Sequence, residues 1–362
     1  MEPREFFIEE RLEMYRNRCR CNLGESGYRA FTTGEVLDFA AISMDELRSI
    51  SLSDSPNQGR ADLRQEIANL YPAVRPNEVL VCTGTSEALY ILFHLLLREK
   101  SKVALYFPAF QALYEVPLML GAEIIQVPVK EKLSAKDWQE IDADLFVINH
   151  PHNPTGLDFD PQEQTEFLEL MRQKNKPVLF DEHYRFLDRK DEIGWTGVSP
   201  MDQFFGTGSF TKCFGVTGLR VGWLVAEKDI IARARSFKDY LTHTVSPLSE
   251  RIALGLLKNR KQFLARIKEE VENNINYFQR NLPKLTDIVR MDPMYGGLVS
   301  FVQLKEGLLS EQYADRLMEK MGIFVLPGIN FEREGYLRIG YGESHEKFKW
   351  GIDTWIQHSP LI

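Results

Sequence analysis

The chain has 362 residues, of which 44% are hydrophobic, and its 44 lysines and arginines against 52 aspartates and glutamates leave a formal net charge of -8. A chain of this length forms two or three domains and buries enough core to need no disulfide or structural metal. The acidic balance argues against a nucleic-acid partner, because neutralising phosphates needs an excess of basic side chains. The most apolar stretch, residues 88–97, is far shorter than the roughly 20 residues that span a bilayer, so we expect no membrane segment.

The N-terminus and the cysteines indicate the cellular compartment. Residues 1–7 lack the basic start, the apolar run and the cleavage site of a secretory signal, and we therefore expect a cytoplasmic protein. The spacing of the four cysteines completes neither a zinc site nor a disulfide framework. We expect them to be free thiols.

The predicted elements begin with an amphipathic helix over residues 6–18 and a glycine-containing turn at 24–27. We expect residues 1–45 to form an arm that packs on the C-terminal part of the chain. A helix that carries Leu63, Ile67 and Leu70 follows, and then short β-rich runs alternate with helical segments. The expected strands are 79–82, 103–106, 124–127, 145–148, 178–180 and 221–225, and the expected helices between them are 87–99, 110–120 and 161–174.

Continuous apolar strands that alternate with helices predict a mostly parallel sheet covered on both faces. We therefore expect an α/β fold, with a three-layer αβα large domain over residues 46–250. A long charged helix over about 249–282 then leads into a smaller α+β C-terminal domain over residues 251–362. Its expected strands are 298–304, 323–326 and 336–340. In such sheets, ligands bind at the carboxyl ends of the strands.

Polar residues collect after the expected strands. A Gly/Thr/Ser turn at 83–86 opens a helix, and the free N–H groups of a helix N-terminus suit a phosphate, although such a turn also serves as an ordinary cap. Segment 149–156 and Asp181 follow two further strands. Lys212 lies in the apolar, glycine-rich stretch 208–222, where burial lowers the pKa of an ammonium group and makes it a nucleophile or a Schiff-base former.

Five motifs occur in the order and spacing of a known enzyme family. They are Gly84-Thr85-Ser86, Asn153-Pro154-Thr155-Gly156, Asp181-Glu182-His183-Tyr184, Ser209-Phe210-Thr211-Lys212 with Arg220, and Leu337-Arg338-Ile339-Gly340. Through them nearly the whole chain resembles the fold-type-I enzymes that use pyridoxal 5'-phosphate, and within these the class I and II aminotransferases. The resemblance implies a transaminase that acts on an L-amino acid and a 2-oxo acid, and a homodimer with its sites at the subunit interface.

The resemblance also implies roles for the residues that carry the chemistry. Lys212 would hold the cofactor as an internal aldimine and later move the substrate proton. Asp181 would pair with the pyridine nitrogen and keep it protonated, which makes the ring an electron sink. Asn153 and Tyr184 would hydrogen-bond the 3'-oxygen of the ring.

Further residues match the cofactor and substrate contacts of the family. The expected phosphate site consists of Gly84, Thr85, Ser86, Ser209 and Arg220. Phe110 matches the aromatic residue that stacks on the ring, although an ordinary core phenylalanine is the alternative. Arg338 matches the arginine that grips the substrate α-carboxylate, because its guanidinium binds a carboxylate through two donors. Gly24 and Asn153 are the other expected substrate contacts.

Two departures from the family pattern stand out. Many relatives carry a tyrosine shortly before the glycine of segment 59–64, and it reaches the cofactor phosphate of the partner subunit. Here residues 53–58 stand instead, with Ser55 or Asn57 as possible substitutes. His183 occupies a position where relatives often have an apolar residue, and with His150 and His152 it raises the alternative of a metal site. Their separate positions in the sequence argue against such a site, and we expect no metal.

Two other functions remain open. The N-terminal segment through Gly27 resembles the opening of a branch that includes capreomycidine synthase, which dehydrates and cyclises a hydroxylated arginine. Elimination or cyclisation is therefore the alternative to transamination, because Lys212 and Asp181 serve both reactions. A cofactor-sensing DNA-binding regulator is disfavoured, since only residues 1–45 precede the large domain and the chain is acidic.

Overall fold

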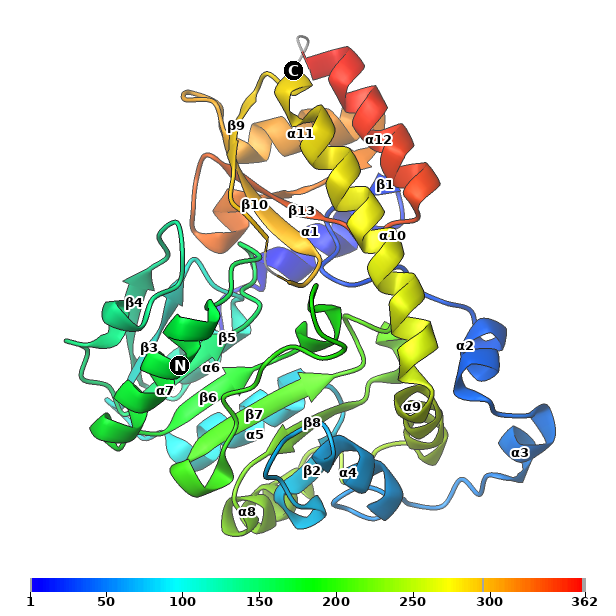
Figure 1. Cartoon of the computed structure of the whole chain (residues 1–362), viewed down its shortest axis with the longest axis vertical. Helices are drawn as coiled ribbons and strands as arrows, with labels where there is room; N and C mark the ends of the chain where they lie inside the picture. The colour runs from blue at the N-terminus through cyan, green and yellow to red at the C-terminus, as the bar shows by residue number, and fades with distance from the viewer. Residues whose placement is uncertain (1, 295, 360–362) are drawn as a thin grey trace.

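The computed structural model describes residues 2–294 and 296–359, and a seven-stranded sheet dominates it (Figure 1). The strand order is β2-β8-β7-β6-β5-β3-β4. These strands are β2 (Val79–Cys82), β3 (Lys102–Phe107), β4 (Glu123–Pro128), β5 (Leu145–Asn149), β6 (Val178–Asp181), β7 (Phe204–Ser209) and β8 (Gly222–Val225). Neighbours from β7 to β4 run parallel, and β8 runs antiparallel to both β2 and β7. The prediction of a mostly parallel sheet is confirmed.

Strand β7 was not among the expected strands. Its sequence contains Gly206 and Gly208, and glycine inside a strand weakens the pattern by which strands are found. Both glycines are required by close packing. A Cβ at Gly206 would lie 2.5 Å from a methyl carbon of Val198, and one at Gly208 would lie 2.4 Å from the ring of Trp223.

Helices cover both faces of this sheet. They are α4 (Ala61–Ala68), α5 (Thr85–Leu96), α6 (Ala112–Met119), α7 (Pro161–Lys174), α8 (Lys228–Lys238) and α9 (Pro247–Lys258). Along β3, Val103 and Leu105 pack in the apolar cluster of α5, α6 and α8, whereas Ala104 and Tyr106 pack in the cluster of α4, α7 and α9. Because successive side chains of a strand point to opposite faces, this alternation gives the three layers predicted for the α/β fold.

The expected long helix over 249–282 is wrong in one respect, because the chain breaks it at Asn259. Helix α9 ends at Lys258 and α10 runs over Arg260–Asn281, while Asn259 itself has φ -101° and ψ 14°. The side chain of Asn259 donates to the carbonyl of Gly255 at 2.9 Å. The break lets α9 pack on the large sheet while α10 runs in a different direction, toward the second sheet (Figure 1).

A second, four-stranded sheet has the order β12-β13-β10-β9. Its strands are β9 (Ile288–Met291), β10 (Val299–Leu304), β12 (Leu326–Pro327) and β13 (Tyr336–Gly340), and the helices beside it are α11 (Ser310–Met321) and α12 (His345–His358). The expected strand over 323–326 is divided: β11 (Ile323–Phe324) pairs with β1, and Leu326 begins β12. Strand β9 was not predicted from the sequence.

The N-terminal arm is built into this second region. It contains α1 (Phe7–Tyr15), β1 (Cys21–Asn22), α2 (Thr33–Ala40) and the start of α3 (Met44–Ser49), and β1 runs parallel to β11. Ile8 and Leu12 of α1 are buried in an apolar cluster with residues of β10, β12 and α11. Helix α2 packs instead against α9. The division of the chain into 1–45, 46–250 and 251–362 stays a prediction.

The remaining elements are single-turn 3-10 helices at 76–78, 135–138, 185–187, 200–202, 217–219, 282–284 and 328–331. All four cysteines are free thiols, as expected. None of the helices in the described part of the chain is both long and apolar enough to cross a membrane.

Candidate active site

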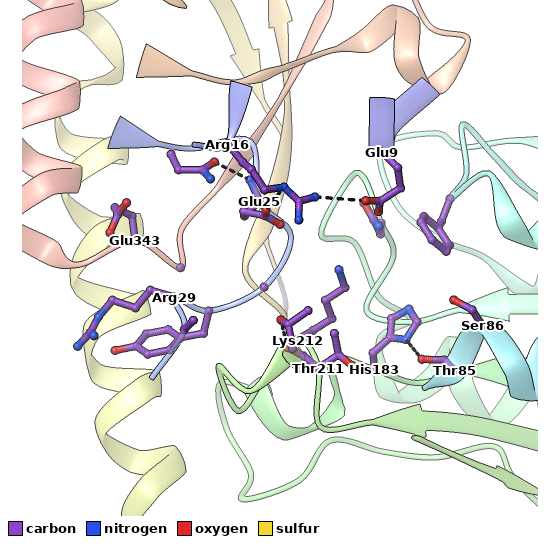
Figure 2. Close-up of a pocket in the computed structure, with 18 of the residues that line it drawn as sticks. Glu9, Arg16, Glu25, Arg29, Thr85, Ser86, His183, Thr211, Lys212 and Glu343 are labelled. Carbon is purple, nitrogen blue, oxygen red and sulfur yellow. Dashed lines mark hydrogen bonds and ion pairs between the residues drawn. The ribbon is translucent and has the colours of Figure 1, made fainter. Parts of the chain in front are cut away.

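A cavity of about 740 Å³ lies between the N-terminal arm and the edge of the large sheet where the parallel strands end (Figure 2). The predicted site residues that line it are Thr85, Ser86, Phe110, Asn153, Lys212 and Arg220. Five of them follow the carboxyl end of a strand, where ligands of such sheets bind, and Arg220 precedes the antiparallel strand β8. The other predicted site residues, which do not line the cavity, are Gly24, Gly84, Asp181, Tyr184, Ser209 and Arg338.

Lys212 follows β7 and points its amine into the cavity (Figure 2). The side chain is half-buried, and Nζ donates a hydrogen bond to Oγ of Ser26 at 2.9 Å. Burial lowers the pKa of Lys212; the carboxylate of Glu25 opposes this effect, and the guanidinium of Arg338 adds to it. A larger share of the amine is therefore neutral than in water, as a nucleophile requires.

Asp181 ends β6 and has no exposed surface. Its Oδ1 accepts from the hydroxyl of Thr207 at 2.9 Å, and its Oδ2 accepts from Nδ2 of Asn149 at 3.1 Å. Nε2 of His183 lies 3.0 Å from the same Oδ2, and Nδ1 of His183 lies 3.5 Å from the hydroxyl of Thr85. These contacts hold the carboxylate in one orientation directly behind His183, which lines the cavity.

The turn before α5 forms a cradle for an anion. Gly84 has φ +81°, and a Cβ there would lie 2.7 Å from Nη2 of Arg220, so glycine is needed for this close approach. Helix α5 begins at Thr85, and the N–H groups of its first turn have no partner within the helix. The exposed guanidinium of Arg220 adds a charge. Ser209 is buried at the end of β7, where it pairs with Gly222 of β8. This donor set suits a phosphate.

Arg338 lies deeper than expected, with no exposed surface. Nη1 donates to Oδ1 of Asn153 at 3.1 Å, and Nη2 donates to the carbonyl of Gly24 at 2.6 Å. Its Nε has no hydrogen-bond partner among the described residues. Buried N–H groups in native proteins are nearly always paired, so this donor marks a place where an acceptor is expected.

Tyr184 is also buried, and burial raises the pKa of its phenol. Its hydroxyl donates to the carbonyl of Ser26 at 2.7 Å. A phenol has a single proton, so in this arrangement Tyr184 can act toward any other group only as an acceptor.

The sequence analysis missed most of the cavity wall that the arm contributes. Phe6, Glu9, Arg16 and Glu25 line it, and the ring of Phe6 lies 5.6 Å from the ring of Phe110. No local pattern marks these residues, because their partners lie far away in the sequence. Ser26, the partner of Lys212, was missed for the same reason.

The arm is anchored beside the cavity by paired contacts. Oε1 of Gln111 accepts from the N–H of Phe7 at 3.0 Å, and Nε2 of Gln111 donates to the carbonyl of Glu5 at 2.8 Å. Arg4 forms an ion pair with Glu115 at 2.7 Å. These contacts hold the arm against α6.

The other two histidines of the metal alternative have protein partners. His150 has no exposed surface, and its Nε2 lies 3.2 Å from Oε1 of Glu182. His152 bonds to the hydroxyl of Thr155 at 2.8 Å. No group of three or more potential metal ligands occurs in residues 2–294 and 296–359.

The proposed substitutes for the family tyrosine do not line the cavity of this chain. Nδ2 of Asn57 donates to Oδ1 of Asp239 at 2.6 Å, and Ser55 is buried. A contact of either residue with a partner subunit stays a prediction.

Comparison with known proteins finds a family model that matches most of the chain. A family model described as aminotransferase class I and II matches residues 22–353. The chain is 27% identical to capreomycidine synthase of Streptomyces vinaceus, over 92% of this chain and 88% of that protein. It is 26% identical to an aspartate aminotransferase of Pyrococcus horikoshii, over 96% of this chain and 95% of that protein.

Solved structures share the fold. A PLP-dependent aminotransferase from Streptococcus suis superposes with a TM-score of 0.90 at 22% identity, over 99% of this chain and 98% of that one. The PLP-dependent cyclase OrfR superposes with a TM-score of 0.92, also at 22% identity, over 100% of this chain and 98% of that one. The fold class that the resemblance implied is confirmed.

Proposed function

Because the chain belongs to the class I and II aminotransferase family, we propose that it is a pyridoxal-phosphate-dependent aminotransferase that moves an amino group between an L-amino acid and a 2-oxo acid. The observation that carries the proposal is the amine of Lys212. It points into a cavity whose lining includes Thr85 and Arg220 of the anion cradle. The buried guanidinium of Arg338 bonds Asn153, which lines the same cavity. A reactive amine, a phosphate site and a carboxylate site are what such a reaction needs.

The cofactor is pyridoxal 5'-phosphate, and the residues present fit it. Gly84 lets the guanidinium of Arg220 approach the turn before α5, since a Cβ there would lie 2.7 Å from Nη2. The guanidinium and the free N–H groups in the first turn of α5 are therefore close enough to share a phosphate. The residues that would hold the phosphate are Gly84, Thr85, Ser86, Ser209 and Arg220. When bound, this cofactor withdraws electrons from the α-carbon of an amino acid.

Lys212 would act first as the nucleophile toward the cofactor aldehyde and then as the proton carrier at the substrate α-carbon. Both tasks need a neutral amine, and burial around Lys212 favours the neutral form by lowering its pKa. Among the described residues, the other lysine that lines the cavity is Lys347, and it is exposed.

Asp181, Asn153 and Tyr184 would act on the cofactor ring. Asp181 would face the ring nitrogen with a carboxylate that Thr207 and Asn149 hold in place. Asn153 lines the cavity and would donate through Nδ2, since its Oδ1 accepts from Arg338. Tyr184 would donate to the ring oxygen only after its hydroxyl leaves the carbonyl of Ser26.

Arg338 would bind the α-carboxylate of the amino acid. Its free Nε supports this role, and so does its contact with Asn153, which lines the cavity. Since the guanidinium has no exposed surface, a carboxylate can reach it only if Gly24 or Asn153 moves aside. We also propose a homodimer in the cytoplasm as the working form.

A PLP-dependent elimination or cyclisation is the second candidate. The similarity to capreomycidine synthase over 92% of this chain favours it. Lys212 and Asp181 would serve this reaction equally well, because it too begins with removal of the α-proton. The two candidates differ in what leaves the substrate.

The products decide between them. Purified holoenzyme is incubated with a panel of L-amino acids, with and without an added 2-oxo acid, and products are quantified by mass spectrometry. A transaminase releases one equivalent of new 2-oxo acid per site without an acceptor and turns over continuously with one. Continuous release of ammonia or of a dehydrated cyclic product without an acceptor would contradict the proposal in favour of the second candidate.

A further inference from the structure

Ser26 joins two predicted site residues of the large sheet to the arm. Its Oγ accepts from Nζ of Lys212 at 2.9 Å, and its carbonyl accepts from the hydroxyl of Tyr184 at 2.7 Å. The residue is only 5% exposed. Ser26 therefore contacts the reactive amine with its side chain while its backbone is held by a buried phenol.

The backbone around Ser26 is fixed on both sides. A Cβ at Gly340 would lie 2.0 Å from the carbonyl oxygen of Glu25, and a Cβ at Gly342 would lie 2.3 Å from that of Gly27. The arm thus runs so close to the end of β13 that both positions require glycine. On the other side, the N–H of Tyr28 donates to the carbonyl of Lys212 at 2.8 Å. A segment held this closely places the Ser26 hydroxyl accurately.

We propose that Ser26 is the positioning residue of the Lys212 amine in every state in which that amine is not linked to the cofactor; this inference rests on the proposed function. The lysine side chain rotates about four bonds, and holding it in one rotamer costs conformational entropy that a bond to a fixed acceptor offsets. Among the described residues, Oγ of Ser26 is the one hydrogen-bond acceptor of Nζ. The bond occupies one N–H and leaves the lone pair of the amine free to attack or to take a proton.

Capture of the cofactor by the cofactor-free protein tests the proposal without relying on turnover. Pyridoxal 5'-phosphate is mixed with wild type and with Ser26→Ala, and the absorbance band of the lysine-linked cofactor is followed by stopped flow from pH 6 to 9. We expect Ser26→Ala to slow capture about tenfold, because the amine no longer holds its attacking geometry. The pH profile should also shift toward lower pH, because the lost acceptor favoured the ammonium form.

Two further variants separate positioning from a structural effect. Ser26→Thr keeps the hydroxyl and should restore most of the capture rate. Ser43→Ala is the matched control, because the hydroxyl of Ser43 caps α3 in the same arm, at Glu46, away from the cavity. It should capture the cofactor at the wild-type rate. If Ser26→Ala fails to fold, Ser26→Cys replaces it, since a thiol of similar size is a weak acceptor and should also slow capture.

The outcomes distinguish this inference from the proposed function. If wild type forms no lysine-linked band, or if Lys212→Ala still forms it, the proposed function fails. If wild type captures the cofactor on Lys212 and Ser26→Ala does so at the same rate with an unchanged pH profile, only the role of Ser26 is wrong. In turnover, Ser26→Ala should lower kcat about tenfold and leave KM nearly unchanged.

Discussion

Nε2 of His183 lies 3.0 Å from Oδ2 of Asp181, so an imidazole of the cavity wall contacts the carboxylate that is predicted to face the cofactor ring. The same Oδ2 accepts from Nδ2 of Asn149. His183 is thus placed both to pack against a bound ring and to orient the group behind it.

Replacing His183 should weaken cofactor binding. We expect His183→Ala to raise the Kd for pyridoxal 5'-phosphate about tenfold, because the variant loses the packing surface at Thr85 and a contact with Asp181. Absorbance titration of the cofactor-free protein with pyridoxal 5'-phosphate measures this Kd. His94→Ala is the control, because His94 bonds within its own helix to the carbonyl of Tyr90 and should leave Kd within about twofold. Tighter binding by His183→Ala would instead show that the imidazole competes with the ring for Asp181.

The phosphate cradle predicts a large effect of a single methyl group. Gly84→Ala forces an alanine into φ +81° and places its Cβ 2.7 Å from Arg220, so the unfolding free energy should fall by about 1 to 3 kcal/mol. The Kd for pyridoxal 5'-phosphate should rise at least about tenfold, because the displaced guanidinium is a predicted phosphate donor. Urea unfolding and cofactor titration measure the two effects.

A matched substitution lies in the arm. A Cβ at Gly34 in α2 would meet nothing within 4 Å, so Gly34→Ala should leave cofactor binding unchanged and be neutral or stabilising by roughly 0.5–1 kcal/mol. Equal Kd values for the two alanine variants would refute the cradle.

Arg338→Lys should impair every substrate alike. Lysine keeps the charge, but its three donors share one nitrogen and cannot reproduce the planar guanidinium that reaches Asn153 and Gly24 and leaves Nε free for a carboxylate. We expect KM to rise about 10- to 100-fold for amino acids and 2-oxo acids, measured in both half-reactions. Arg11→Lys is the control: Arg11 is also buried and pairs with Asp315, but it lies outside the cavity lining. An effect confined to one substrate would mean that Arg338 contacts the side chain.

Two buried histidines should make stability depend on pH in opposite directions. Burial disfavours the charged form of His150, but the carboxylates of Asp158 and Glu182 outweigh it and raise its pKa to about 9. A pKa raised above the ordinary 6.5 gives stability that is present below pH 6.5 and lost as the pH rises through 9. Burial lowers the pKa of His152 to about 3, so its contribution is present above pH 6.5 and lost as the pH falls toward 3.

Urea unfolding across pH 5 to 10 checks both signs. Wild type should lose up to about 3 kcal/mol of stability relative to His150→Asn between pH 6.5 and 9. Relative to His152→Asn, wild type should lose stability only as the pH falls below 6.5. If the His150→Asn curve runs parallel to that of wild type above pH 6.5, His150 is not charged in the folded protein.

The sequence predicted the large sheet well, because strands covered on both faces are apolar throughout. It failed at β7, where Gly206 and Gly208 serve packing against Val198 and Trp223 rather than strand preference. It also failed at Asn259, where the helical pattern breaks although the residue at the break is neither proline nor glycine. The side chain of Asn259 bonds to Gly255 and to the carbonyl of Ala40, a residue far away in the chain. Such a contact leaves no local signal.

The site was predictable where strand ends carry unusual residues, and Lys212, Asn153 and Arg220 do line one cavity. Ser26 was not predictable, because a serine in a turn has no pattern and its partner lies 186 residues away. The depth of Arg338 was not predictable either. Its burial depends on the carbonyl of Gly24, which the pairing of β1 with β11 brings over it. The assigned roles stay predictions.

The pairing of β1 with β11 also determines when, during synthesis of the chain, the site can be completed. Gly24 and Arg338 are 314 residues apart, which at about 5–20 residues per second corresponds to roughly 15 to 60 s of synthesis. Throughout that interval β1 has no partner strand, and the carbonyl of Gly24 has no guanidinium from which to accept a hydrogen bond. A nascent chain cut short before Ile323 can therefore fold much of its large sheet, yet it holds an unfinished site, and premature termination yields no partly active product.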